Sequence, residues 1–388
     1  MERLFAVTVR DWLERSKSGG MSLGLERTMA TLEKLGRPDK SLQCIHVAGS
    51  NGKGSTCAHL AASLIRSGHQ VGLFTSPHVS RIEERIRVNG IPISPESFDS
   101  ALKIVHVASD DLTFFEITYL AALVACRDAG CEYMILETGL GGRLDATRTA
   151  EVIGCLVTSI SLEHSDILGD TLEEVAKEKA AIARSGIPII IKKPAGNIQK
   201  AMLEIAPHAR FIEVSENIHD EAKTLARELL TELKLPWKDG SINWPARMQR
   251  IDGTPTILLD AAHNPSGIVK VMPQIIAELP EKWVLVFGSS PQNDLENFLK
   301  PISSLIEEYC PKRVIFTEPQ GGRYPALSQF PLRGEWIRNP SEAIESAKAE
   351  DCDLILVIGS LYLCGNILSH LQLDSDDDLN ILSSTGDP

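Results

Sequence analysis

The stretch that decides the fold is Cys44–Ser63, CIHVAGSNGKGSTCAHLAAS. Its apolar start predicts a buried strand, and its Ala- and Leu-rich end predicts a helix. Between the two, Gly49, Gly52 and Gly54 let backbone N–H groups converge on an anion. The helix N-terminus adds its dipole and Lys53 adds a charge. The order strand, glycine-rich loop, helix therefore predicts a phosphate-binding loop.

The spacing within this loop differs from the usual nucleotide-binding pattern. Two residues separate Gly49 from Gly52, and Gly54 stands between Lys53 and Ser55. An ordinary glycine-rich turn is the alternative interpretation. We favour nucleotide binding, because a lysine after glycine and a pair of hydroxyl residues at the helix start are what a Mg-nucleotide needs.

Length and composition limit the class of protein. A chain of 388 residues with 43% hydrophobic content exceeds one ordinary core and predicts two domains. Its net charge of −13 argues against nucleic acid as the main partner. No segment approaches the roughly 20 apolar residues of a membrane span, so we expect a cytoplasmic protein that binds neither nucleic acid nor membrane. The eight cysteines form no CxxC pair, which predicts reduced core residues.

Polar residues close several apolar segments that read as strands in the first part of the chain. Ser76 follows QVGLFT, Glu137 follows YMIL, and Glu163 with His164 follow VIGCLVTSISL. Helical stretches separate these strands, which is typical of a parallel sheet. Because parallel strands end at one edge, we expect the polar side chains to lie there with the phosphate loop.

Three further local patterns carry predictions. Residues 1–40 predict two helices, with a break at 19–22. Residues 80–94 predict a hairpin around an Asn-Gly turn. Residues 171–186 predict a helix with Thr171 as N-cap and Gly186 as its stop.

A second series of strands and helices begins after residue 240. We therefore predict an α/β fold with a P-loop parallel-sheet ATP-binding domain over 1–240 and a smaller Rossmann-like α/β domain over 241–371. Residues 372–388 are acidic and polar and predict a disordered tail.

Candidate metal ligands lie at the predicted strand ends. Ser76, Glu137 and His164 offer a hydroxyl, a carboxylate and an imidazole, a plausible set for Mg²⁺ at nucleotide phosphates. For Glu137 a surface or capping role is disfavoured by the apolar run before it. For His164 a structural role is as plausible as a ligand role. The spacing of Lys179 indicates only a solvated helix face.

The second series carries its own polar cluster. Asp260 and His263 close the strand TILL, and Asn264-Pro265 turns the chain into the next helix. A group of helix N-cap residues is the alternative interpretation. Arg247 lies near the predicted domain junction, where a guanidinium can clamp phosphate.

Nine motifs occur in a familiar order, and through them the chain resembles the folylpolyglutamate synthase/dihydrofolate synthase family, the folate branch of the Mur ligases. The resemblance covers about residues 20–370 and rests on GSNGKGS, TSPHVSRIEERI, LTFFEIT, ILETGLGGRLDAT, TSISLEHSDILG, KEKAAI, WPARMQRI, LLDAAHNP and VIGSLYL. It implies an ATP-dependent amide ligase that makes an acyl phosphate, which the amine of L-glutamate then attacks. The acid would be a folate such as tetrahydrofolate, or dihydropteroate.

The resemblance also implies roles for residues at the matching positions. Lys179 would be carbamylated and would add a metal-binding carboxylate. The resemblance implies catalysis by Lys53, Lys179, Asp260 and His263; ATP binding by Asn51, Gly52, Lys53, Gly54, Ser55, Arg247 and Asp260; substrate binding by Ser76, Pro77, Phe115, Arg143 and Asp145; and Mg²⁺ binding by Ser76, Glu137 and His164.

The chain departs from the family pattern in three places. Glu163 stands where the family commonly has Asp, and residues 20–23 lack an Asp expected near the pterin. The segment between GIPIII and WPARM is shorter than usual, and Glu221 occupies the place of an Asn that contacts ATP in the family. The change at Glu163 keeps a carboxylate, whereas the other two departures bear on pterin and nucleotide binding.

Three hypotheses follow. The first is a folate-pathway ligase, acting as a monomer on ATP, L-glutamate and a folate-type acid. The second is a Mur-type ligase for another acid. The third is a nucleotide-binding protein that has lost catalysis. Because the predicted site residues are shared between two domains, the ligase hypothesis also predicts that the domains close during catalysis.

Overall fold

The structure is a computed structural model that describes residues 8–17, 24–215, 217–292, 294–322 and 326–382. The chain divides into two compact units. The first comprises Met1–His78, Ile82–Asn243 and Asn380–Pro388, and the second comprises Val79–Arg81 and Trp244–Leu379. The main crossing, between Asn243 and Trp244, lies close to the boundary predicted at residue 240.

The first unit contains an eight-stranded sheet with the order β4-β3-β2-β5-β1-β6-β7-β8. The run from β2 to β8 is parallel, as predicted, and β3 and β4 are antiparallel additions at one edge. In sheet order the strands are Ile91–Pro92, Ile86–Val88, Val71–Phe74, Tyr133–Glu137, Gln43–Ala48, Val152–Val157, Ile189–Lys192 and Arg210–Ile212.

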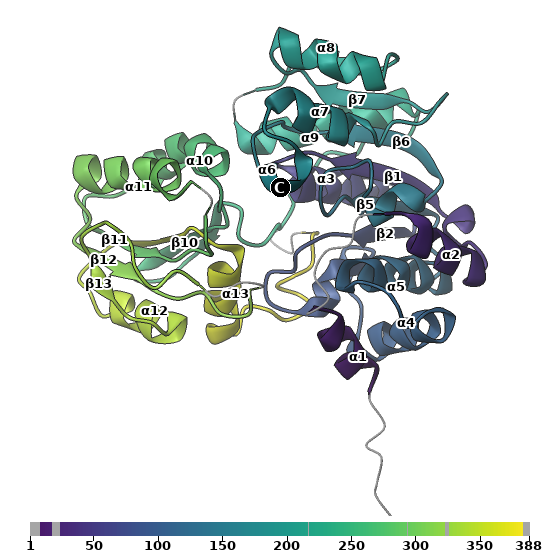
Figure 1. Cartoon of the computed structure of the whole chain (residues 1–388). Coiled ribbons are helices and arrows are strands. Elements are labelled where there is room, and N and C mark those ends of the chain that lie inside the picture. The colour runs from purple at the N-terminus through teal and green to yellow at the C-terminus, as the bar shows by residue number, and fades with distance from the viewer. Residues whose placement is uncertain (1–7, 18–23, 216, 293, 323–325, 383–388) are drawn as a thin grey trace, which may run out of the picture. The chain divides into compact units, whose positions relative to one another are not determined.

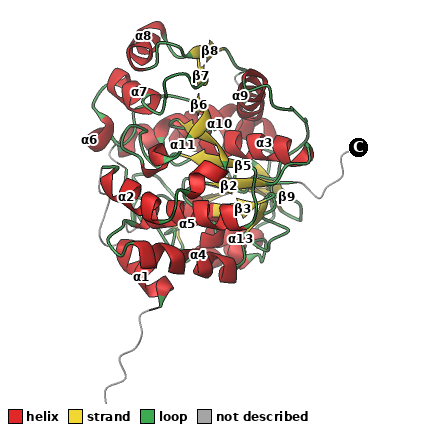
Figure 2. Cartoon of the chain, turned by 90° about the vertical axis from the view of Figure 1, so that its right-hand side faces the viewer, coloured by secondary structure: helices red, strands yellow, loops and turns green. Residues whose placement is uncertain are grey.

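Helices cover both faces of this sheet, because its central strand is apolar on both sides. Cys44 and Ala48 of β1 belong to the hydrophobic cluster that contains α5 residues. Ile45 and Val47 are also fully buried and point to the other face, where α3 and α9 pack against each other. Figure 2 shows the yellow strands among these red helices. The helices are α1 Val9–Ser16, α2 Glu26–Lys34, α3 Lys53–Arg66, α4 Pro95–Ala108, α5 Phe114–Asp128, α6 Ser165–Leu168, α7 Leu172–Ala180, α8 Gly196–Ile205 and α9 Ile218–Glu232.

Two local predictions for this unit can be compared directly with the structure. The hairpin is confirmed: Asn89 and Gly90 both have positive φ, 51° and 89°, as a type I′ turn requires. The predicted helix over 171–186 is too long. Its N-cap is Thr171, as predicted, but α7 ends at Ala180. The early end follows from Arg148, whose guanidinium donates 2.8 Å to the Ala181 carbonyl and so satisfies the backbone without another helical turn. The predicted break at 19–22 lies outside the described residues.

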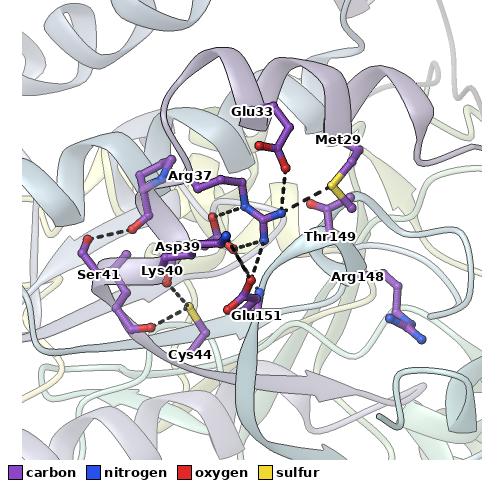
Figure 3. A network of polar contacts seen from close by, with 12 residues as sticks. Met29, Glu33, Arg37, Asp39, Lys40, Ser41, Cys44, Arg148, Thr149 and Glu151 are labelled. Atoms are coloured by element: carbon purple, nitrogen blue, oxygen red, sulfur yellow. Dashed lines mark hydrogen bonds and ion pairs between the residues drawn. The ribbon is translucent and has the colours of Figure 1, made fainter. Parts of the chain in front are cut away.

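An ion-pair network lies at the end of the sheet where the central strand β1 begins (Figure 3). The Arg37 guanidinium donates to both carboxylate oxygens of fully buried Asp39, at 2.7 and 3.0 Å. Asp39 also accepts the Glu151 backbone N–H at 3.0 Å, just before β6. This bidentate contact raises the pKa of Arg37 above its ordinary value. The network therefore fixes the start of two central strands, whose other ends carry the predicted site.

The second unit is a smaller α/β layer structure, as predicted. Its six-stranded sheet has the order β13-β12-β11-β14-β10-β9, parallel except for β9. Figure 1 shows α10 and α11 on one side of this sheet and α12 and α13 on the other. The elements are β9 Gln249–Ile251, β10 Thr256–Asp260, α10 Pro265–Glu278, β11 Trp283–Phe287, α11 Leu295–Tyr309, β12 Arg313–Phe316, β13 Glu335–Trp336, α12 Pro340–Lys348, β14 Leu354–Ile358 and α13 Leu361–His370.

The end of the described chain differs from the predicted disordered tail. Leu379 and Ile381 are fully buried. The Ile381 N–H donates to the Gly90 carbonyl and its carbonyl accepts the Asn243 N–H, each at 3.0 Å. These two apolar residues outweigh the acidic residues before them, so the prediction is wrong for this part. Residues 383–388 lie outside the described residues.

The cysteines behave as predicted. All eight are free thiols, and each of them is buried except Cys310.

Among the helices that the structure describes, none combines the length and the apolar character needed to cross a bilayer.

Candidate nucleotide and metal site

The predicted phosphate loop connects β1 to α3 and depends on two glycines. Gly49 has φ of +144°, and a Cβ there would lie 1.9 Å from the Thr158 hydroxyl. Gly52 has φ of +83° and is the N-cap of α3. Neither position tolerates an ordinary side chain, the first for space and the second for its left-handed backbone. The glycine pattern is therefore a geometric requirement of this loop.

The residues after β6 hold the loop from the side. The Asn51 carbonyl accepts hydrogen bonds from the hydroxyls of Thr158, at 2.7 Å, and Ser159, at 3.0 Å. The Ser50 N–H donates to the Ser159 carbonyl at 2.7 Å, and the Ser161 N–H donates to the Ser50 hydroxyl at 3.0 Å. These bonds fix the loop before any ligand binds, which is the preorganisation that anion binding requires.

Lys53 begins α3 and folds back over the loop. Its ammonium donates to the Gly49 carbonyl at 2.9 Å and to the Ser50 carbonyl at 3.1 Å. The positive charge of Lys53 thus lies at the phosphate loop, just before Gly54 and Ser55 in the first turn of α3. This placement agrees with the predicted phosphate-binding role.

Two of the three predicted metal ligands are in contact. Glu137 is the last residue of β5 and is 5% exposed. Its carboxylate accepts the Ser76 backbone N–H at 2.9 Å, where β2 ends beside β5. Because β1 pairs with β5, this contact lies at the same sheet edge as the phosphate loop.

His164, the third predicted ligand, lies on the other side of β1, after β6. It is exposed and has a left-handed backbone with φ of 48° at the start of α6. In the described part of the chain, no group of three or more His, Cys, Asp and Glu side chains is arranged to hold a metal ion. Of the three predicted ligands, Ser76 and Glu137 are therefore brought together, and His164 is placed beyond β1.

Lys179 is buried, which contradicts the interpretation of a solvated helix face. It is 2% exposed, and its ammonium donates to the Glu163 carboxylate at 2.7 Å. Burial lowers the pKa of Lys179, and the Glu163 carboxylate opposes this only in part. Burial raises the pKa of Glu163, but Lys179 and Lys53 outweigh it and hold that pKa below its ordinary value.

A signal for the burial of Lys179 exists in the sequence of α7. Val175, Ala176 and Ala180 form its buried stripe, and Lys179 falls in that stripe at i+4 from Val175. A lysine that falls among small apolar residues at helical spacing is predicted to be buried, even where other lysines lie nearby in the sequence.

The glycine-rich loop after Glu137 packs against α7 and α5. A Cβ at Gly142 would lie 2.7 Å from the Glu178 carbonyl, and Arg143 pairs with the Glu178 carboxylate at 2.7 Å. A Cβ at Gly139 would lie 2.5 Å from the Phe115 ring. The loop therefore packs closely on α7, which carries Lys179, and on Phe115 of α5, which is predicted to bind the substrate.

Asp145 organises this loop from within. One carboxylate oxygen accepts the N–H groups of Gly139 and Leu140, at 3.0 and 2.9 Å, and the other accepts the N–H and hydroxyl of Thr147. Burial raises the pKa of Asp145. These four hydrogen bonds hold the loop in shape, a role of Asp145 that the sequence spacing did not predict. The resemblance implied only a contact with the substrate.

His46 on β1 completes the network, and sequence reasoning missed it. Its Nε2 lies 2.7 Å from the Thr147 hydroxyl and 2.9 Å from the Thr138 hydroxyl. Because Thr147 gives its proton to Asp145, Nε2–H of His46 is the donor. Burial lowers the pKa of His46 well below its ordinary value, so the ring is neutral. His46 thus connects the central strand to the loop beside Glu137.

In the second unit, Asp260 and His263 follow β10 as predicted. The Asp260 carboxylate accepts the N–H groups of Met248, at 3.0 Å, and Ala262, at 2.8 Å. His263 Nδ1 donates to the Ala261 carbonyl at 2.8 Å, which leaves Nε2 as the basic nitrogen. The alternative of an N-cap cluster holds for Asn264, which caps α10 before Pro265.

Arg247 is partly exposed in the second unit. The Asp260 carboxylate raises the pKa of the buried Cys364 thiol, and the Arg247 guanidinium lowers it. Both side chains therefore lie near enough to that thiol to act on its charge. Arg247, Asp260 and His263 all lie in the second unit, and their joint role stays a prediction. The predicted closure of the two domains stays a prediction.

The chain matches two domain families in the expected order. Residues 47–235 match the Mur ligase middle domain, and residues 246–361 match the Mur ligase glutamate ligase domain.

Curated relatives match over nearly their whole length. The dihydrofolate synthase/folylpolyglutamate synthase of Escherichia coli strain K12 is 30% identical over 403 residues, covering 92% of this chain and 93% of that protein. The enzyme of the same name from Bacillus subtilis strain 168 is 28% identical over 424 residues, covering 94% and 98%.

Solved structures agree with these relatives. E. coli FolC in complex with DHPP and ADP superposes with a TM-score of 0.84 at 26% identity, covering 95% of this chain and 98% of that one. A bifunctional folylpolyglutamate synthase/dihydrofolate synthase with Mn, AMPPNP and L-glutamate bound gives 0.82 at 26% identity, covering 94% and 98%. Taken with the phosphate loop and the Mur ligase domains, these matches show that the chain belongs to the folylpolyglutamate synthase/dihydrofolate synthase family of Mur ligases, a family of ATP-dependent ligases.

Proposed function

We propose that this chain joins L-glutamate to the carboxylate of a folate-type acid at the expense of ATP. The observation that carries the proposal is the arrangement at one edge of the first sheet. There the phosphate loop after β1 lies between the Ser76–Glu137 contact on one side and the segment with Glu163 and His164 on the other. Solved relatives with ADP, AMPPNP and L-glutamate bound support the same substrates here.

The chemistry has two steps. The substrate carboxylate attacks the γ-phosphorus of ATP, so that ADP leaves and an acyl phosphate forms. The glutamate amine then attacks the acyl carbon, phosphate leaves, and the amine loses a proton. In both steps negative charge builds on oxygen atoms, which oriented N–H groups and cations stabilise.

The phosphate loop supplies this stabilisation for ATP. Backbone N–H groups of Gly52–Ser55, at the N-terminus of α3, would face the phosphates, and Lys53 would neutralise their charge. From the second unit, Arg247 and Asp260 contribute nucleotide contacts. His263 would take the amine proton, because its Nδ1–H is held by the Ala261 carbonyl and its Nε2 is then the basic nitrogen.

The donor set at the sheet edge fits Mg²⁺. Ser76, Glu137 and His164 would hold the ion, with oxygen ligands from the first two. When bound, the ion neutralises phosphate charge and polarises the transferred phosphoryl group. A solved relative that contains Mn with AMPPNP supports divalent metal use.

A carbamylated Lys179 would supply a further oxygen ligand. Carbon dioxide adds to the neutral amine, a proton is lost, and a carboxylate forms at the end of the side chain. Two observations support this modification: Lys179 is nearly fully buried, and its helix packs against the loop that follows Glu137. In the unmodified state described here, Glu163 balances the ammonium.

The acid substrate would lie on the glycine-rich loop after Glu137. Phe115 offers a partly exposed ring against Gly139 for a flat heterocycle, and Pro77 is exposed beside Ser76. Arg143 is 57% exposed and offers a cation to a substrate carboxylate. Asp145 holds the loop in the shape that presents these groups.

Glu221 favours a second candidate, a nucleotide-binding protein without ligase activity. This residue replaces the Asn that contacts ATP in the family, and it is buried near the phosphate loop. A Mur-type ligase for another acid is the remaining alternative, since one scaffold accepts many substrates.

The test is a phosphate-release assay with ATP, Mg²⁺ and L-glutamate, with tetrahydrofolate and dihydropteroate supplied separately. Release that requires both glutamate and one of the folates, with the glutamylated product found by mass spectrometry, supports the proposal. ATP binding without release under either condition supports the binding-protein alternative. Release with glutamate and a different carboxylic acid alone supports a Mur-type ligase for another acid.

The proposal includes a monomer in the cytoplasm whose partners are small molecules. The net charge of −13 disfavours a polyanionic partner such as nucleic acid. Light scattering during gel filtration tests the monomer, and a mass of about 85 kDa, roughly twice the 42.4 kDa of the chain, contradicts it.

A further inference from the structure

An ion pair lies beside the phosphate loop and has no role in the ligase chemistry described above. The Glu221 carboxylate, in the first turn of α9, accepts a hydrogen bond from the Lys192 ammonium at the end of β7, at 2.6 Å. Glu221 is 2% exposed, whereas the Lys192 side chain is 26% exposed. The pair is therefore a buried anion with a cation on its solvent side.

The carboxylate is close to the loop itself. A Cβ built on Gly52 would lie 3.9 Å from Glu221 Oε1. Gly52 is the N-cap of α3, so it stands at the helix end whose N–H groups would face the phosphates of a nucleotide. A negative charge thus stands against a loop built to bind negative charge.

This placement has an electrostatic consequence. Charges of the same sign repel, so the Glu221 carboxylate disfavours an anionic phosphate at the loop, and a tenfold change in Kd corresponds to about 1.4 kcal/mol. Lys192 reduces this repulsion by partial neutralisation. The pair therefore acts on nucleotide binding through its charges, without needing a direct contact with the ligand.

We propose that the Lys192–Glu221 pair sets the affinity of the phosphate loop for its nucleotide, with Glu221 weakening phosphate binding and Lys192 limiting that effect. The proposal rests on the proposed function, in that the loop binds ATP and releases ADP. A weaker loop releases the product nucleotide faster, which is useful where product release limits turnover.

A purely structural pair makes a different prediction. If Glu221 and Lys192 served only to fasten α9 to β7, loss of either partner would lower stability, and nucleotide affinity would fall or stay the same in both variants. Opposite changes in affinity from the two variants distinguish the electrostatic role from the structural one.

The experiment is a titration of the full-length protein with the fluorescent nucleotide mant-ADP in the presence of Mg²⁺. Glu221→Gln should lower the Kd about tenfold, because the carboxylate is lost and the Lys192 charge acts on the loop. Lys192→Met should raise the Kd by a similar factor. The double variant should return toward the wild-type Kd, and Lys192→Arg should keep it.

A neighbouring ion pair provides the matched control. Lys193 pairs with Glu213, with side chains that are 47% and 79% exposed. Lys193→Met and Glu213→Gln likewise remove one lysine and one glutamate charge, at a pair where solvent screens them, and should change the Kd less than twofold. Thermal unfolding of every variant verifies that the compared proteins are folded.

The outcomes separate this proposal from the proposed function. Failure of the wild-type protein to bind mant-ADP overturns the proposed function. If the wild type binds but Glu221→Gln binds no more tightly, the pair does not set the affinity and this proposal is overturned. Should Glu221→Gln not fold, the comparison of Lys192→Met with Lys192→Arg decides: equal Kd values for the two overturn the proposal.

Discussion

The ammonium of Lys179 lies 2.7 Å from a carboxylate oxygen of Glu163, and the lysine side chain is almost completely enclosed by the protein. A buried cation with a single short ion pair is held in one place and depends on its partner. The pair joins α7 to the segment after β6, next to the phosphate loop.

The first prediction concerns this lysine. Lys179→Ala should remove most of the ligase activity, because it deletes the side chain that we propose carries a metal-binding carbamate. Lys179→Glu should restore part of it by returning a carboxylate. The measurement is phosphate release at saturating substrates. Lys177→Ala is the matched control on the same helix, since Lys177 is 41% exposed and pairs with Glu204 at the surface. Full activity of Lys179→Ala would contradict the proposed role.

The second prediction concerns the phosphate loop. Lys53→Ala should abolish ATP turnover, because the loop then lacks the cation that neutralises the phosphates. The expected loss exceeds a hundredfold, of the order seen when a group that stabilises transition-state charge is removed. Lys40→Ala, an exposed lysine before the other end of β1, should leave turnover unchanged. Normal rates for Lys53→Ala would return the loop to the ordinary-turn interpretation.

The third prediction is about metal dependence. Glu137→Gln keeps the hydrogen bond from Ser76 but removes the charge, so it should raise the Mg²⁺ concentration needed for half-maximal turnover at least tenfold. EDTA should abolish turnover by the wild type. Glu132→Gln is the control, since Glu132 precedes the same strand and is 49% exposed. An unchanged Mg²⁺ requirement would exclude Glu137 as a ligand.

The fourth prediction follows from His46, whose pKa is lowered from 6.5 by burial and by the nearby Arg184 and Arg148 charges. The unfolded chain binds a proton on this ring below pH 6.5, and the folded protein does not. The free energy of unfolding must therefore fall as the pH decreases through 6.5, by about 1.4 kcal/mol at pH 5.5. His46→Gln lacks this term and should lose less stability between pH 7.5 and 5.5. Urea titrations at the two pH values measure the difference, and equal losses in both proteins would show that His46 is protonated when folded.

The fifth prediction concerns the second unit. Asp260→Asn and His263→Ala should each reduce kcat by at least a hundredfold, although both residues lie far along the chain from Lys53. The reason is that the proposed nucleotide and proton-transfer contacts of this unit are lost. Asp252→Asn, at a side chain that is 89% exposed in the same unit, should have no effect. Normal rates in both site variants would remove these residues from the mechanism.

Local patterns were enough to predict the parts of the site that depend on neighbouring residues in the chain. The glycines of the phosphate loop, the polar end of β5 at Glu137 and the turn at Asn264-Pro265 each follow from a few adjacent residues. The α/β class follows in the same way, because apolar strands alternate with capped helices along the sequence.

The remaining features depend on contacts between distant segments. His46 is one polar residue in an apolar strand, and its hydroxyl partners Thr138 and Thr147 lie some 90 and 100 residues later. The early end of α7 is set by Arg148, from a different loop. Pairs such as Glu221 with Lys192 are defined by tertiary packing, which spacing along the chain does not encode.

The buried Leu379 and Ile381 bear on how the chain reaches its native state. Asn380–Leu382 belong to the first unit, yet ribosomes make these residues after the whole second unit. During synthesis, the carbonyl of Gly90 and the N–H of Asn243 therefore lack these hydrogen bonds until Ile381 has been made. The nascent first unit therefore passes through a stage in which its sheet can form but residues 380–382 have not yet been made. A ribosome stalled before residue 379 would hold the first unit in that state.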